Sequence, residues 1–145
     1  MTEFTVTPIG HVESTITETD DGTGATLRNY PATIVVNNKY LKGLTNFDER
    51  VGTGTDAFLD VVFYFDGINA DEIELAGQSG EGLTPAGLGG VFTRRTPRRP
   101  NPIGLTTVRV LFREGRYIHV EGLDALDGTP VLDLKPYVDW IDQFK

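Results

Sequence analysis

Four arginines stand within six positions of a chain that is otherwise acidic, with a formal net charge of -8. A guanidinium group is planar and can bind two oxygen atoms of a carboxylate or a phosphate at once. Three prolines among and after the arginines fix φ and remove backbone donors, so the segment is expected to be rigid. Gly104 ends the segment and would let the backbone bend or approach a ligand closely. The segment predicts a local anion site, and a solvated turn with surface ion pairs is the alternative. The residues are Arg94, Arg95, Arg98, Arg99, Pro97, Pro100 and Pro102.

A second polar segment, residues 123–137, combines three aspartates with a lysine and a tyrosine. A turn is expected at Asp127 and a strand after it, in which alternate side chains share a face. Asp133, Lys135 and Tyr137 would then project together. They could bind a polar ligand or transfer a proton, or they could form a structural ion pair. The residues alone leave these alternatives open.

The two histidines, His11 and His119, fall on predicted strands, where a structural role is more common than a catalytic one. The chain has no cysteine, which excludes disulfides, thiolate zinc sites and cysteine nucleophiles. The histidines and the scattered carboxylates lack the spacing of metal ligands. No metal site is therefore expected.

Segments rich in β-branched and aromatic residues recur along the chain, whereas helical periodicity does not. They predict strands, and one pair is expected to form a hairpin with its turn at Glu114 and Gly115. Short helices are expected at 40–50 and 138–144, and glycine-rich loops at 20–24 and 77–90. The pattern predicts an all-β protein, a small barrel or sandwich with at most short helices. The expected strands are 4–12, 32–36, 58–65, 105–112 and 117–121.

The length of 145 residues fits a single domain over residues 1–145. The net charge argues against binding nucleic acid over the whole surface, so any such contact must be local. No stretch approaches the roughly 18 apolar residues of a membrane helix, and the first residues lack the pattern of a signal peptide. A cytoplasmic protein without membrane contact is expected.

Taken together, residues 90–104 and 123–137 resemble the two signature segments of the TsaA-like family, the family of the tRNA-methyltransferase O enzymes. Residues 8–14 are similar to the opening of the same family. The resemblance implies a small, mainly antiparallel β-barrel, a homodimer, and S-adenosylmethionine as the cofactor. It also implies methyl transfer to N6 of threonylcarbamoyl-adenosine in tRNA, next to the anticodon.

The resemblance implies which positions bind the cofactor, and the chemistry of the side chains in both segments suggests their roles. Arg95 would bind the methionine carboxylate, and the carboxylates of the second segment would bind the ribose hydroxyls or the amino group. Arg94, Arg98 and Arg99 would contact tRNA phosphates, and Asp133, Lys135 in its neutral form, or Tyr137 could serve as a catalytic base. The implied cofactor-binding residues are Phe92, Arg95, Asn101, Leu105, Asp124, Ala125, Leu126 and Asp127.

The sequence also departs from the family pattern at three places. A P-R-Q triplet is absent from residues 19–24, Asp66 and Gly67 replace a His-Gln pair, and Phe58 replaces a histidine. Two alternatives to the tRNA enzyme therefore stay open. One is a methyltransferase that uses S-adenosylmethionine on a small molecule or a protein, and the other is a non-catalytic S-adenosylmethionine-binding module.

Overall fold

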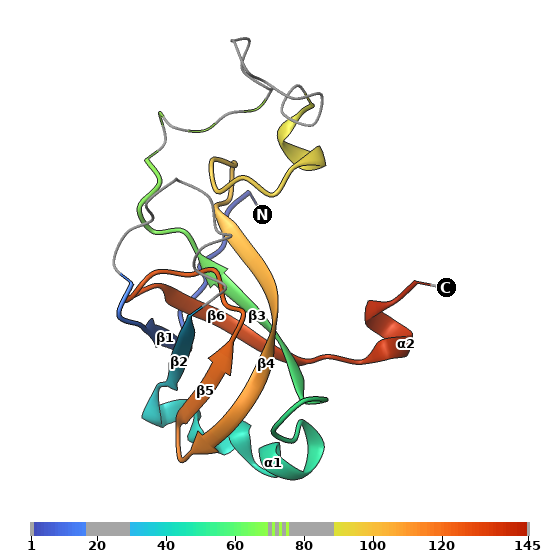
Figure 1. The fold of residues 1–145 in the computed structure, drawn as a ribbon. Coiled ribbons are helices and arrows are strands. Elements are labelled where there is room, and N and C mark those ends of the chain that lie inside the picture. Colours follow the sequence, from blue (N-terminus) through green and yellow to red (C-terminus); the bar gives the residue numbers. More distant parts are fainter. Residues whose placement is uncertain are drawn as a thin grey trace.

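The chain folds into a closed antiparallel barrel of six strands in the order β1-β2-β5-β4-β3-β6 (Figure 1). The computed structural model describes residues 2–16, 30–69, 71, 73, 75 and 89–144. The expected all-β barrel with short helices is thereby confirmed. The strands are β1 (Gly10–Glu13), β2 (Pro31–Val36), β3 (Phe58–Tyr64), β4 (Ile103–Glu114), β5 (Tyr117–Glu121) and β6 (Pro130–Pro136).

The hairpin of β4 and β5 forms where the sequence predicts it, with Glu114 paired to Tyr117. Its turn consists of Gly115 and Arg116, one residue later than expected. Gly115 takes a φ of 58°, which a residue without a Cβ adopts without steric cost. The long strand β4 alternates buried and exposed side chains over most of its length, because one of its faces lines the barrel interior.

The first predicted strand, 4–12, is wrong at its start. The strand begins only at Gly10, and residues 2–8 have no regular structure. Pro8 has no N–H to donate to a neighbouring strand, whereas Ile9 directly after it donates to the carbonyl of Val131 at 2.8 Å. The predicted loops at 20–24 and 77–90 lie outside the described residues, except for residues 89 and 90.

All described helices are short, as expected. The 3₁₀ helix η2 and the helix α1 lie at the lower end of the barrel in Figure 1, where Leu44 and Phe47 are buried. None of the described helices is long and apolar enough to cross a membrane. The helices are η2 (Asn38–Leu44), α1 (Phe47–Arg50), η5 (Val91–Thr93) and α2 (Asp139–Asp142).

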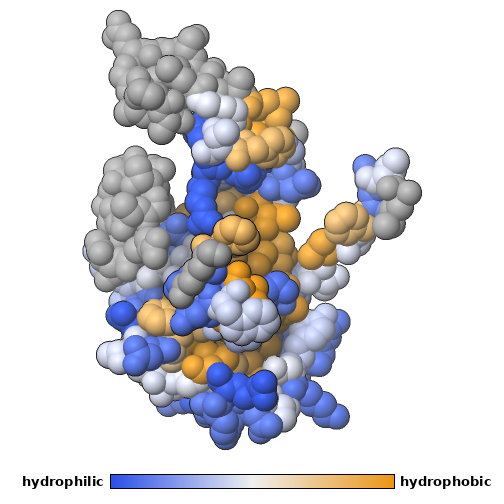
Figure 2. All heavy atoms as spheres, turned by 90° about the vertical axis from the view of Figure 1, so that its right-hand side faces the viewer, coloured by the Kyte–Doolittle hydropathy of each residue, from blue (hydrophilic) through white to orange (hydrophobic). Residues whose placement is uncertain are grey.

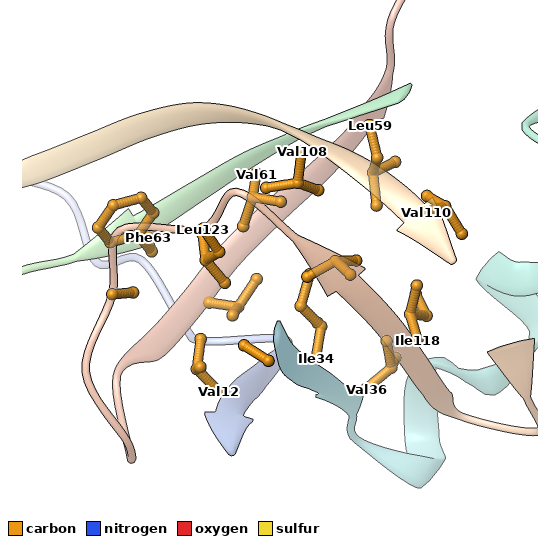
Figure 3. Close-up of a cluster of buried hydrophobic side chains, with 14 of the residues drawn as sticks. Val12, Ile34, Val36, Leu59, Val61, Phe63, Val108, Val110, Ile118 and Leu123 are labelled. Carbon is orange, nitrogen blue, oxygen red and sulfur yellow. The ribbon is translucent and has the colours of Figure 1, made fainter. Parts of the chain in front are cut away.

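Inward-facing side chains from all six strands fill the barrel, and Figure 3 shows most of these side chains. Burial of each large apolar side chain stabilises the fold by about 1.5–3 kcal/mol. Leu123 and Ala125, from the connection between β5 and β6, belong to the same core. That connection is therefore anchored to the barrel, and residues beside the anchors have a fixed backbone.

Candidate functional site

A cleft of about 460 Å³ lies where the arginine and proline segment meets β3, β4 and the β5–β6 connection. In Figure 1 the segment lies above the upper end of the barrel, at the start of β4. The cleft brings together residues from both predicted segments, which are far apart in the sequence. The predicted residues that line it are Phe92, Arg94, Arg95, Arg99, Leu105 and Asp124.

Arg95 connects the segment to β4. Its Nη1 donates a hydrogen bond to the backbone carbonyl of Leu105 at 3.2 Å. A guanidinium has five N–H groups, so this bond leaves donors for a ligand. Both side chains are exposed, with Leu105 at 48%. Two of the predicted cofactor-binding residues are thus in direct contact at the edge of the cleft.

Arg99 holds the segment in shape. Its Nη1 donates to the carbonyl oxygens of Arg94 at 2.9 Å and Thr96 at 3.3 Å. At the start of the segment, Val91 is buried and anchors η5. The expected rigidity therefore has a second source besides the prolines, and Arg99 serves the loop itself as well as lining the cleft.

The floor of the cleft is aromatic. Phe63 and Phe65 pack edge to face with ring centroids 5.1 Å apart. The ring of Phe63 lies so close to Gly104 that a Cβ on Gly104 would be 2.5 Å from the nearest ring carbon. A close approach at Gly104 is what the sequence predicts, but its partner is this ring of the core rather than a ligand.

Asp124 faces the cleft from the β5–β6 connection. Its neighbours Leu123 and Ala125 are buried in the core, so the Asp124 side chain projects between them in another direction. The hydroxyl of Thr106 donates to its Oδ1 at 2.5 Å. The cleft therefore offers a cationic side chain, Arg95, and an anionic one, Asp124, over an aromatic floor.

Comparison with known proteins identifies the family of the chain. The profile of the tRNA-methyltransferase O N-terminal domain family matches residues 23–143. The chain belongs to this family. An S-adenosyl-L-methionine-binding protein of Archaeoglobus fulgidus is 33% identical over 138 residues, which are 93% of this chain and 90% of that protein. A tRNA (adenine(37)-N6)-methyltransferase of Mus musculus is 53% identical over 49 residues, which are 34% of this chain and 11% of that protein.

Solved structures of the tRNA-methyltransferase O family share the fold. A crystal structure of TrmO from Pseudomonas aeruginosa superposes with a TM-score of 0.69 at 28% identity, covering 98% of this chain and 59% of that one. Three further curated relatives are matched over between 14% and 38% of their own length. The chain thus spans only part of many relatives in this family.

Four residues that the family resemblance assigned to the cofactor do not line the cleft. Asn101 lines a separate hollow against the N-terminal segment. Ala125 is buried in the core, and the carbonyl of Leu126 accepts a hydrogen bond from the Thr129 hydroxyl at 2.7 Å. Asp127 accepts one from the amide of Ser14 at 2.9 Å. Leu126 and Asp127 thus stabilise the turn before β6, and Asp124 is the residue of this connection that lines the cleft.

The three residues predicted as candidate bases also lie away from the cleft. Asp133 and Lys135 form an ion pair of 2.9 Å on the outer surface of β6, which β3 separates from β4. Asp133 raises the pKa of Lys135, which favours the charged ammonium and argues against a neutral amine base. Tyr137 follows the end of β6 rather than continuing its face, and its hydroxyl accepts from Gln143 at 2.7 Å.

The histidines are outer-surface residues of the barrel. The hydroxyl of Thr33 and Nδ1 of His119 lie 2.9 Å apart, and the ring of Phe112 stacks on His119 with centroids 4.1 Å apart. Nε2 of His11 is 3.3 Å from Glu13. Within residues 2–16, 30–69 and 89–144, no three His, Asp or Glu side chains are grouped as metal ligands would be.

Outside the two predicted segments, residues 90–104 and 123–137, sequence reasoning missed three residues of the cleft: Phe63, Phe65 and Thr106. All three lie on or directly after a predicted strand, where apolar and β-branched residues are typical of a core. The spacing that predicts a strand gives the face of each side chain but not the end of the barrel at which it lies. The glycine at position 104 was the one available signal, because it indicated a close contact at this place.

Proposed function

We propose that this chain binds S-adenosylmethionine in the cleft and transfers its methyl group to N6 of an adenosine in tRNA. The observation that carries the proposal is the combination of Arg95 and Asp124 over an aromatic floor in a cleft of about 460 Å³. Pockets for small ligands usually have volumes of about 300–1,000 Å³, and this cleft falls within that range. The names of the relatives from Archaeoglobus fulgidus and Mus musculus support the same assignment.

Each part of the cleft suits a part of this cofactor. The remaining donors of Arg95 can bind the methionine carboxylate, because a guanidinium matches the geometry of two carboxylate oxygens. Asp124 can accept from a hydroxyl or ammonium group, and the rings of Phe65 and Phe92 offer apolar surface to the adenine. The sulfonium supplies an electrophilic methyl group and leaves as a neutral thioether, so the protein contributes mainly the position of the acceptor.

The proposed acceptor is threonylcarbamoyl-adenosine beside the anticodon, held through the arginines next to the cofactor. Arg94 lines the cleft, and Arg98 is exposed on the same segment. Phosphate contacts by arginine provide affinity without reading the base sequence. On a chain of net charge -8, these contacts would have to be concentrated at this segment.

We also propose a homodimer. Figure 2 shows hydrophobic atoms gathered in the centre of one face of the molecule. Paired residues of β3 and β4 expose apolar side chains on the outer surface, among them Tyr64, Ile103 and Leu105. A second copy would cover this surface beside the cleft. Light scattering at micromolar concentration measures the mass of the particle in solution. The mass of a monomer would contradict the proposed homodimer.

Calorimetry with S-adenosylmethionine tests the cofactor site. The wild type should bind, Arg95→Ala should weaken binding about tenfold or more, and Arg98→Ala should leave it unchanged. Radiolabelled methyl transfer then tests the acceptor, using tRNA with and without the threonylcarbamoyl group. The proposal requires transfer that depends on that group.

Two other outcomes have clear meanings. Failure of the wild type to bind S-adenosylmethionine would refute the cofactor assignment. Binding without transfer to either tRNA would refute the tRNA assignment and favour a small-molecule or protein acceptor, or a non-catalytic binding module. The net charge of -8 is the observation that favours these alternatives.

A further inference from the structure

Thr106 places a hydroxyl group inside the upper end of the barrel. It occupies an inward position of β4, beside core residue Val108 in the alternating pattern, and only 6% of its surface is exposed. Burying a hydroxyl costs free energy unless it forms a hydrogen bond. A valine would fill the same space without that cost, so the partner of this hydroxyl is informative.

The partner is Asp124. The Thr106 hydroxyl donates to Oδ1 of Asp124 at 2.5 Å, a hydrogen bond between a neutral donor and a carboxylate. The part of the chain that the structure describes shows no second hydrogen bond or ion pair at this carboxylate. The connection carrying Asp124 has its backbone fixed by Leu123 and Ala125 in the core. The remaining freedom is the rotation of the Asp124 side chain, and the bond to Thr106 restricts it.

We infer that Thr106 is a positioning residue for the cofactor: it holds Oδ1 of Asp124 and so directs Oδ2 into the cleft. This inference rests on the proposed binding of S-adenosylmethionine. With Oδ1 engaged, Oδ2 is the oxygen that accepts from an N–H or O–H group of the cofactor. Threonine suits the task, because its branched side chain has few rotamers in a strand. A carboxylate that is already oriented loses less entropy when the ligand binds.

The neighbouring residue Thr107 provides a matched control. It follows Thr106 on β4 and also donates its hydroxyl to an aspartate, Asp60, at 2.6 Å. Alternate residues of a strand face opposite sides, so Thr107 faces outward, and it does not line the cleft. Thr106→Val and Thr107→Val therefore remove the same donor from adjacent positions, and only the first removes it from the cleft.

Calorimetric titration of S-adenosylmethionine into four proteins tests the inference. Thr106→Val should raise Kd about tenfold relative to the wild type, as expected for one hydrogen bond to a charged group. Thr107→Val should bind as the wild type does. Thr106→Ser keeps the donor and should restore binding to within about twofold. Thermal unfolding of each variant serves as the structural readout, and Thr106→Ala replaces Thr106→Val if the valine variant does not fold.

A second series separates positioning from direct contact. If Thr106 acts only through Asp124, then Thr106→Val should have no further effect on Kd in the Asp124→Ala protein. Equal losses in both backgrounds would overturn the inference, as would unchanged binding by Thr106→Val. In both cases the wild type still binds S-adenosylmethionine, so the proposed function survives. A wild type that does not bind would overturn both together.

Discussion

Gly104 is a residue whose side chain, a single hydrogen, decides the shape of the cleft. Any Cβ there would lie 2.5 Å and 2.6 Å from ring atoms of Phe63, a distance at which the ring must move. Phe63 is 1% exposed and packs in the core, so it has little room to move. Phe63 therefore belongs both to the core of the barrel and to the floor of the cleft.

Gly104→Ala is predicted to destabilise the protein by about 1–3 kcal/mol, the usual cost of overpacking a core. Because the displaced ring is also the floor of the cleft, binding of S-adenosylmethionine should weaken as well. Urea denaturation measures the first effect, and calorimetry measures the second. Gly43→Ala is the control, since a Cβ on Gly43 would have no heavy atom within 4 Å. Equal stability of the two variants would contradict the prediction.

Among the elements, the strands were predicted best. The observed bounds of β5 match the prediction, and β2, β3 and β4 differ from it by a few residues at most. Alternation of apolar residues reports burial on one face, which is why these strands could be located. The first strand was wrong because its apolar residues Phe4 and Val6 are exposed, and only the contacts of a folded barrel show that.

The order of the strands could not be predicted, and the site depends on that order. Alternation says which face a residue occupies but not which strand lies beside it. Arg95, Leu105 and Asp124 were assigned from motif resemblance, and the structure brings them to one cleft. Asp127, three positions further along the same turn, bonds to the amide of Ser14 instead. The sequence does not show which of Asp124 and Asp127 reaches the cleft. Asp124 does so because its neighbours Leu123 and Ala125 are buried in the core, and this burial is known only from the folded structure.

Asp60 lies on the face of β3 that points away from the barrel interior, but its carboxyl group is buried. Four elements contribute to its environment. Burial raises the pKa of Asp60, the hydrogen bond from Thr107 of β4 lowers it in part, and Asp142 of α2 raises it again. Lys135 of β6 stands opposite Asp60 but is paired with Asp133. A raised pKa means that the folded state binds the proton more tightly than the unfolded state. The free energy of unfolding should therefore fall as the pH rises from about 4 through the raised value.

Asp60→Asn is predicted to remove the fall in the free energy of unfolding that accompanies ionisation of Asp60 at rising pH. The asparagine keeps an oxygen that can accept from Thr107, and it carries no charge to bury. The variant should be more stable than the wild type at pH 7, and the difference should shrink as the pH falls toward 4. Urea denaturation at several pH values between 4 and 8 measures it. A variant that is less stable by the same amount at every pH would show that the carboxylate is favourable where it stands.

At the scale of the whole molecule, an acidic chain carries a basic segment at one end of its barrel. Four arginines stand within residues 94–99, while the formal charge of the chain is -8. The rest of the surface repels a polyanion, so binding to tRNA should be weak except where this segment meets phosphate. Affinity for tRNA should therefore depend on few residues, and its fall with salt should reflect only the few phosphate contacts that these arginines make.

Arg98→Ala is predicted to weaken tRNA binding without changing the affinity for S-adenosylmethionine. Each lost phosphate contact should reduce the slope of log K against log salt concentration by about 1. Filter binding between about 50 and 200 mM salt measures that slope. Arg50→Ala is the matched control, because α1 lies at the opposite end of the barrel and the change in charge is the same (Figure 1). An equal change of slope in the two variants would mean that only net charge matters, and that the arginine segment does not contact the RNA.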